Sequence, residues 1–124
     1  MNELNQVLTE MDFEFFSSGE HGMSIEGMRK VLGNDNFVFL DIRSDREVEY
    51  LSFPFAVHIP LNKLPERLEE LPKDKLIITF CSSIFRGAVA YTFLRANGFE
   101  NVKGLTATVE EMVKAFKPGP LAKM

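Results

Sequence analysis

Hydrophobic residues fall in short blocks along the chain, separated by polar segments that contain glycine, proline, asparagine or aspartate. Residues 37–41, 55–59 and 76–80 form three such blocks, rich in β-branched and aromatic side chains. Blocks of this length and composition predict buried strands. A shorter strand is expected over residues 101–104.

Helical patterns fill most of the stretches between these blocks. Ser24 can cap a helix that runs to about Leu32, and the capping-box patterns in residues 44–47 and 108–111 predict two more helix starts. Leucines at helical spacing predict a helix within residues 62–71, and the apolar stretch 85–97 predicts a buried helix. Strands that alternate with helices indicate an α/β domain with a mainly parallel sheet.

The first 22 residues stand outside this alternation. Leu4, Val7, Leu8 and Met11 share one helix face, three phenylalanines follow at positions 13, 15 and 16, and residues 17–22 are expected to form a loop. The chain is therefore expected to divide into an N-terminal helical extension, 1–22, and a main domain, 23–124. The extension either docks on that domain or presents its phenylalanines to a partner or a second copy.

Composition narrows the classes of function. With 124 residues, 45% of them hydrophobic, the chain is long enough for one globular domain, and its net charge of −4 argues against nucleic acid as a partner. No apolar run approaches the ~20 residues of a membrane helix. The start lacks the features of a secretory signal, so a cytoplasmic location is expected. One cysteine and two histidines, His21 and His58, without ligand spacing predict no metal site, and no cofactor is expected.

Cys81 is the only cysteine, and it stands where the strand 76–80 ends and a short polar loop leads into the apolar helix. The backbone N–H groups from about Ser82 to Arg86 have no helical acceptors and can converge on the sulfur, while Arg86 adds positive charge. These groups favour a thiolate, which is a good nucleophile. They would also stabilise the anionic sulfur of a persulfide. The alternative is a buried structural cysteine.

The length of this loop limits the size of the group that it can bind. Four residues separate Cys81 from Arg86, whereas cysteine phosphatases and arsenate reductases have one more residue between cysteine and arginine, which gives room for a tetrahedral oxyanion. The shorter loop favours a single sulfur atom.

Polar residues elsewhere have competing interpretations. Asp41 also ends a strand, where it either hydrogen-bonds the Cys81 loop or pairs with Arg43. Arg43 and Glu47 lie four residues apart and are expected to form a local pair. His58 can be a proton shuttle, but a structural histidine with satisfied hydrogen bonds is the expected role.

From about residue 24 to 118 the chain resembles single-domain rhodanese-like sulfurtransferases. The resemblance rests on Glu47 and on five segments: Phe39-Leu40-Asp41-Ile42-Arg43, Val57-His58-Ile59-Pro60-Leu61, Leu71-Pro72-Lys73-Asp74-Lys75, the loop from Cys81 to Arg86, and Gly98-Phe99-Glu100-Asn101-Val102. It implies an α/β rhodanese-like fold, in which a mainly parallel central sheet is flanked by helices on both faces.

The resemblance also implies a reaction. Cys81 would take sulfane sulfur as a persulfide from thiosulfate, a polysulfide or a protein persulfide, and would pass it to a thiophilic acceptor such as a small thiol, a sulfur-carrier protein or a thioredoxin-like protein. A monomer or weak homodimer is expected. The implied substrate-binding residues are Ser82, Ser83, Ile84, Phe85, Arg86 and Asp41.

The chain departs from the family pattern at several positions. Ile84 replaces a glycine and would be strained if its φ were positive. Gly87 replaces the usual serine or alanine, and only Pro54 and Ala56 remain of a glycine-rich motif before the second strand. These departures keep open a non-catalytic interaction module and, less consistently with the short loop, a small-oxyanion enzyme.

Overall fold

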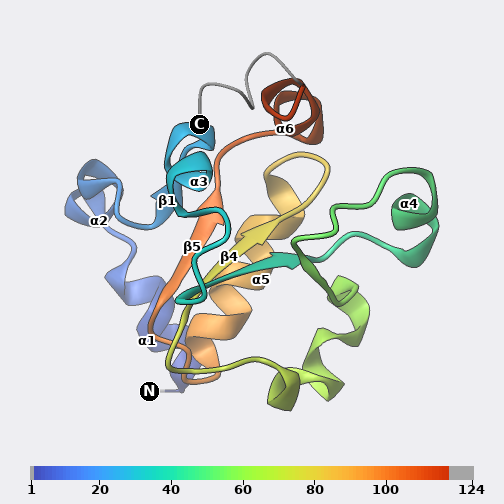
Figure 1. The fold of residues 1–124 in the computed structure, drawn as a ribbon. Helices are drawn as coiled ribbons and strands as arrows, with labels where there is room; N and C mark the ends of the chain where they lie inside the picture. The colour runs from blue at the N-terminus through green and yellow to red at the C-terminus, as the bar shows by residue number, and fades with distance from the viewer. Residues whose placement is uncertain (1, 118–124) are drawn as a thin grey trace.

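Five parallel strands form the centre of the fold, which the computed structural model describes for residues 2–117 (Figure 1). The strands are β1 (Gly22–Met23), β2 (Phe37–Asp41), β3 (Val57–His58), β4 (Leu76–Phe80) and β5 (Val102–Leu105). They lie in the order β1-β5-β4-β2-β3, and every neighbouring pair is parallel. The parallel sheet expected from the alternation of elements is confirmed.

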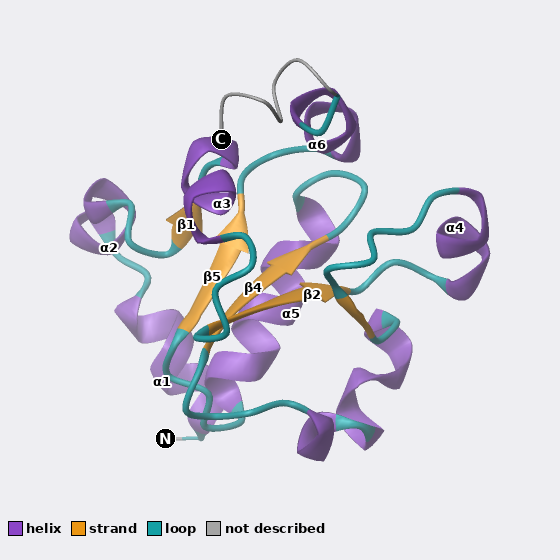
Figure 2. Cartoon of the chain, viewed as in Figure 1, coloured by secondary structure: helices purple, strands orange, loops and turns teal. Residues whose placement is uncertain are grey.

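Helices connect the strands and cover the sheet (Figure 2). Their bounds are α1 (Glu3–Glu10), α2 (Phe13–Ser18), α3 (Ile25–Val31), α4 (Asp45–Tyr50), α5 (Phe85–Ala96) and α6 (Val109–Ala115), with two 3-10 helices, η1 (Leu61–Glu66) and η2 (Leu68–Glu70). The expected Ser24 cap and both capping boxes, at Ser44 and Thr108, are present. These side chains satisfy backbone N–H groups that have no partner within the helix.

The strand residues divide between two hydrophobic clusters on opposite faces of the sheet. On one face, Ile77, Cys81 and Val102 pack with the α5 residues Tyr91 and Leu94. On the other face, Ile78, Phe80 and Leu105 pack with Met28 of α3 and Met112 of α6. Because successive side chains of a strand point to opposite faces, this alternation assigns Cys81 to the face that α5 covers.

Two segments differ from the sequence prediction. The strand expected over 55–59 is limited to Val57–His58, and Phe55 instead turns toward Phe39 and Phe53, with ring centroids 5.5 and 5.6 Å away. Residues 62–71 form 3-10 helices, and Pro65 lies inside the first of them. Proline has no N–H for an α-helical bond, which explains why the leucine spacing does not produce an α-helix.

The N-terminal segment docks on the domain. Helix α1 packs beside α5, and Arg95 of α5 donates to the carboxylate of Glu10 at 2.7 Å. The expected loop 17–22 was wrong at both ends, because α2 extends to Ser18 and Gly22 begins β1, which pairs with β5. A two-residue edge strand has too little pattern to be seen in the sequence.

Helix α5 is less buried than its composition indicates. Phe85 is 76% exposed and Val89 is 42% exposed, whereas Ala90 and Leu94 on the opposite side are fully buried. The prediction of a helix buried on most of its sides was therefore wrong, because α5 has one apolar face toward the sheet and another toward solvent.

A buried ion pair occupies the carboxyl end of β2. The Arg43 guanidinium donates to both Asp41 carboxylate oxygens at 2.7 to 3.1 Å and to the carbonyl of Leu51 at 2.8 Å, and it lies 5.2 Å from the centre of the Phe53 ring. Asp41 and Arg43 are 2% and 3% exposed. Of the two roles open to Asp41, the structure shows the pairing with Arg43.

This pair provides a test of the fold. Asp41→Ala leaves the Arg43 guanidinium buried without its counter-ion, so the free energy of unfolding should fall by about 3–5 kcal/mol. Urea denaturation followed by circular dichroism measures the change. The control is Glu70→Ala, which breaks the exposed Arg67–Glu70 pair and should alter stability little. Equal effects of the two substitutions would contradict this account of the Asp41–Arg43 pair.

Candidate functional site

The Cys81 sulfur is held by the backbone of the loop that joins β4 to α5. Cys81 is fully buried. Its thiol donates to the carbonyl of Ser83 at 3.0 Å, and the backbone N–H of Gly87 donates to Sγ at 3.3 Å. The hydroxyl of Thr79, on the same face of β4, donates to the carbonyl of Gly87 at 2.9 Å. The first turn of α5 is thereby fixed against the strand end, and the loop curves around the sulfur.

The donors around Sγ only partly match the expected arrangement. Within residues 2–117, Gly87 supplies the backbone N–H that is hydrogen-bonded to Sγ, one residue beyond the stretch 82–86 that was expected to converge on it. The thiol donates its hydrogen bond to the Ser83 carbonyl. Sγ thus has one backbone acceptor and one backbone donor as neighbours.

Ile84 fits the loop without backbone strain. Its φ and ψ are −107° and −25°, in the right-handed region, and no residue other than glycine in the described chain has a positive φ. The strain considered for an isoleucine at this position therefore does not arise.

Gly87 is not required by packing. A Cβ added there would lie 3.6 to 3.7 Å from its nearest neighbours, which is ordinary contact. The glycine in place of the usual serine or alanine thus has no steric cause in this structure.

Arg86 is fixed by two side chains. Its Nη1 and Nη2 donate to the two carboxylate oxygens of Glu47 at 2.6 and 2.8 Å, and Nη2 also donates to the Ser82 hydroxyl oxygen at 2.8 Å. The hydrogen bond to Glu47 raises the pKa of Arg86, and interactions with the Cys81 side chain raise this pKa further. The guanidinium therefore lies close to the sulfur with much of its charge compensated.

Glu47 is the site residue that sequence reasoning missed. The expected pair between Glu47 and Arg43 was wrong, since Arg43 is bound to Asp41 and Glu47 to Arg86. Glu47 also closes the capping box of α4, where its Oε1 accepts from the Ser44 N–H at 3.1 Å and from the Ser44 hydroxyl at 2.9 Å. The local spacing to Arg43 obscured a partner 39 positions away.

The structure brings five of the six expected substrate-binding residues together in the loop, and leaves Asp41 out. Asp41 pairs in register with Phe80, so its side chain shares the face of Phe80 and not that of Cys81. Ile84 and Phe85 project outward and are 50% and 76% exposed. The Ser82 carbonyl accepts from the Val109 N–H at 3.2 Å, which ties the loop to α6.

Other candidate chemistry is limited. His58 Nε2 lies 2.7 Å from the Arg43 carbonyl, in agreement with its expected structural role. Across residues 2–117, acidic, histidine and cysteine side chains do not gather in threes or more as a metal ion would need. None of the helices in the same range is both long and apolar enough to cross a bilayer.

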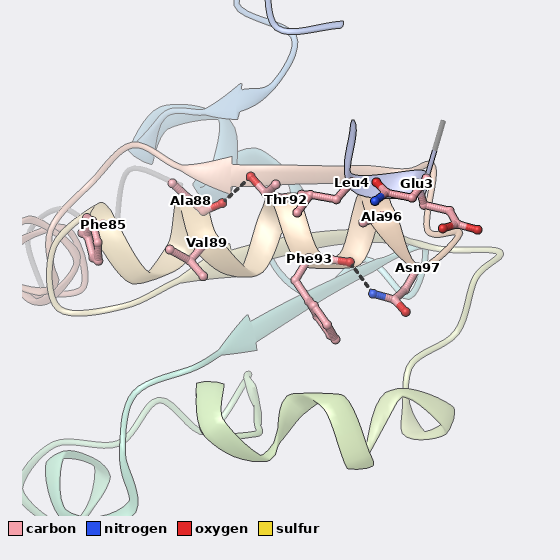
Figure 3. A pocket seen from close by; sticks show the side chains of 10 residues that line it. Glu3, Leu4, Phe85, Ala88, Val89, Thr92, Phe93, Ala96 and Asn97 are labelled. Carbon is pink, nitrogen blue, oxygen red and sulfur yellow. Dashed lines mark hydrogen bonds between the residues drawn. The ribbon is translucent and has the colours of Figure 1, made fainter. Parts of the chain in front are cut away.

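Arg86 and Phe85 each border a surface hollow. One, of about 350 Å³, is lined by Arg86 and by residues after β2 and β3, including Ser44 and Asn62. The other is an open groove of about 700 Å³ along α5, bounded by Phe85 at one end and by the start of the chain at the other (Figure 3). Arg86 and Phe85 thus place both hollows next to the Cys81 loop.

The Glu47–Arg86 pair predicts a pH dependence. Hydrogen bonds from Arg86 and Ser44 lower the pKa of Glu47 from 4.5 to about 2. A carboxylate whose folded pKa is depressed stabilises the fold above its unfolded pKa, and this contribution is lost as the pH falls through the folded value. Since both side chains are about one-third exposed, Glu47→Gln should cost about 1 kcal/mol at neutral pH.

The measurement is the difference in free energy of unfolding between wild type and Glu47→Gln. It should be constant above about pH 4.5 and shrink as the pH falls toward 2. Glu14→Gln, at an exposed position of α2, serves as the control. A difference that does not shrink below pH 4.5 would count against the assigned pair.

Known proteins share this fold and match part of the sequence. Residues 24–115 match the sequence model of the Rhodanese-like domain. YtwF of Bacillus subtilis is 34% identical over 73 residues, which span 59% of this chain and 71% of that protein. A sulfurtransferase of Allochromatium vinosum is 27% identical over 77 residues, 62% of this chain and 72% of that one.

A solved structure has the same fold. The human single-domain sulfurtransferase TSTD1 superposes with a TM-score of 0.69 at 21% identity, over 78% of this chain and 98% of the human chain. At this identity the superposition shows the fold alone, and the sequence match carries the family assignment. The chain therefore belongs to the family of rhodanese-like domains, whose sulfurtransferase members it resembles in sequence and in fold.

Proposed function

We propose that the protein is a sulfurtransferase in which Cys81 carries sulfane sulfur as a persulfide. The observation that carries the proposal is the position of one free cysteine at the end of β4, with its sulfur against the first turn of α5 and accepting from the Gly87 N–H. A donor directed at sulfur favours its anionic form, whether thiolate or persulfide. The short loop holds one sulfur atom more readily than a tetrahedral oxyanion.

The transfer has two balanced steps. After the thiol loses its proton, the Cys81 thiolate attacks the outer sulfur of the donor. A new S–S bond forms, the donor's own bond to that sulfur breaks, and sulfite or a thiolate leaves with the electron pair. An acceptor thiolate then attacks the outer sulfur of the Cys81 persulfide and releases the Cys81 thiolate. Ionisation frees the Ser83 carbonyl but keeps the Gly87 donor in place.

Arg86 and Ser82 provide the polar side of the proposed site. The guanidinium is positioned by Glu47 and borders the 350 Å³ hollow, through which an anionic donor can approach the loop. The Ser82 hydroxyl accepts from Arg86 and retains its own proton for donation. Ser83, Ile84 and Phe85 stay predicted substrate contacts, whereas Asp41, bonded to Arg43 on the other face, is not proposed as one.

The acceptor is proposed to be a small thiol or a protein thiol. Phe85 is largely exposed next to the loop, which suits a thioredoxin-like or sulfur-carrier protein that presents its own cysteine. A reducing cytoplasm would keep Cys81 free. That location and a monomeric or weakly dimeric state stay predictions from the sequence.

A non-catalytic interaction module is the second candidate. It is favoured by the complete burial of Cys81, which requires the loop to open before a donor can reach Sγ. In that case the exposed Ile84 and Phe85 would contact a partner, and a partner captured by the wild type would also be captured by Cys81→Ser.

The proposed function is tested by sulfur loading. Wild-type protein is incubated with thiosulfate or polysulfide, and its intact mass is recorded before and after reduction. We expect the mass to rise by one sulfur atom, to return to its starting value with reductant, and to stay unchanged throughout in Cys81→Ser. Cyanide should remove the same sulfur as thiocyanate.

Ser17→Ala, at an exposed position of α2 outside the Cys81 loop, provides the control and should still load sulfur. If folded wild-type protein gains no reducible sulfur from either donor, the sulfurtransferase proposal is wrong and the interaction module is favoured.

A further inference from the structure

A third hollow, of about 330 Å³, lies between the N-terminal segment and α5, beside the Cys81 loop. Phe15, Phe16 and His21 form one wall, and Ile84, Ala88 and Thr92 form the facing wall. We call this hollow the α5 pocket. None of the sequence patterns or the proposed chemistry so far assigns it a role.

The sheet register places this pocket at the level of the reactive sulfur. Thr79 of β4 pairs with Gly104 of β5, so two residues further along each chain lie Cys81 and Thr106. Both Gly104 and Thr106 line the pocket, and by strand alternation they face α5 as Cys81 does. Ile84, three residues after Cys81 in the loop, lines the pocket.

The lining of the pocket is mainly apolar. The three aromatic rings of its outer wall form a cluster with centroids 5.0 to 5.3 Å apart, and the lining includes no lysine, arginine, aspartate or glutamate. The Thr92 hydroxyl donates to the Ala88 carbonyl and the Thr106 hydroxyl to the Met23 carbonyl. His21 Nδ1 is buried without a hydrogen-bond partner in the described chain.

These properties indicate the chemistry of an occupant. A pocket of this size lies at the small end of ligand sites, and a lining without lysine or arginine gives a dianion such as thiosulfate no permanently charged partner. An aryl or branched alkyl group would instead gain aromatic contacts. Arg86, which is paired with Glu47, does not line this pocket.

We propose that the α5 pocket binds the apolar group R of an organic sulfane-sulfur donor, and so selects such donors over inorganic thiosulfate. This inference rests on the proposed function. With a hydropersulfide, the Cys81 thiolate forms a bond to the outer sulfur, the S–S bond of the donor breaks, and RS⁻ leaves with the electron pair. With an organic thiosulfonate, the same attack releases the sulfinate RSO₂⁻.

The kinetic test compares benzenethiosulfonate with methanethiosulfonate, which differ in R alone. Each rate of Cys81 persulfide formation is divided by the rate of the same donor with a free thiol, which corrects for intrinsic reactivity. We expect the wild type to prefer the aryl donor on the order of tenfold, the discrimination that a hydrophobic pocket achieves. Equal corrected rates, with sulfur loading intact, would overturn the pocket and leave the proposed function standing.

Thr92→Leu, which fills the pocket, should abolish this preference. Thr9→Leu is the matched control, because Thr9 also donates its hydroxyl to the carbonyl four residues earlier in an exposed helix but does not line the pocket. If the aryl preference survives in Thr92→Leu, the R group binds elsewhere.

A binding measurement separates the pocket from the sulfur chemistry. Benzenesulfinate, the leaving group of the aryl donor, is titrated into Cys81→Ser while the imidazole signals of the two histidines are followed by NMR. The His21 signals should shift and the His58 signals should not, whereas methanesulfinate should move neither. A shift at His21 without sulfur loading would retain the pocket and reject the transfer, and no shift at His21 would reject the pocket directly.

Discussion

The hydrogen-bonded register of β4 is the constraint on which the rest of the structure depends. Strand β4 pairs with β2 along its whole length and with β5 along three residues, so its carboxyl end cannot shift relative to either neighbour. A slip of one residue would move Cys81 to the opposite face, away from α5. The register therefore fixes the face of the reactive sulfur and brings it to the level of Thr106.

The alternation of side chains between the two faces of the sheet also separates two ion pairs. Their acidic residues lie close together in the sequence. Asp41 and Arg43 form a buried pair beside Phe53, where the guanidinium also satisfies the Leu51 carbonyl. Glu47, in the first turn of α4, reaches across to Arg86 at the loop. The Asp41–Arg43 pair fixes the path of the chain where it leaves β2. This path sets the position of α4 and of Glu47. The arginine next to the sulfur is thus positioned by a helix from the neighbouring strand connection.

Sequence patterns predicted the elements whose signals are local. The alternation of strands and helices, the Ser44 and Thr108 capping boxes and the position of Cys81 at a strand end could all be read from short windows. Strand β1 could not, because it is two residues long and exists only by pairing with β5. The exposure of Phe85 and Val89 could not be predicted either, because composition alone does not show which side of α5 lacks a covering element.

The candidate site could likewise be predicted only where its signals are local. The loop residues are consecutive, so finding Cys81 was enough to find Ser82 through Arg86. Their partners were not, because the pairing of Arg86 with Glu47 joins residues 39 positions apart and competes in the sequence with the closer Arg43. The choice between the two roles of Asp41 could not be made for a related reason: being at a strand end does not decide the face of the sheet, which follows from register with Phe80.

Ile84 shows how a departure from a family pattern can be structural instead of damaging. A glycine is required at a loop position only where φ is positive, and Ile84 has φ −107°. The backbone there accepts a side chain, and the structure uses it, because the half-exposed isoleucine lines the α5 pocket facing Phe15 and Phe16. The residue that first argued against a competent site therefore lines an apolar pocket, three residues after Cys81 in the chain.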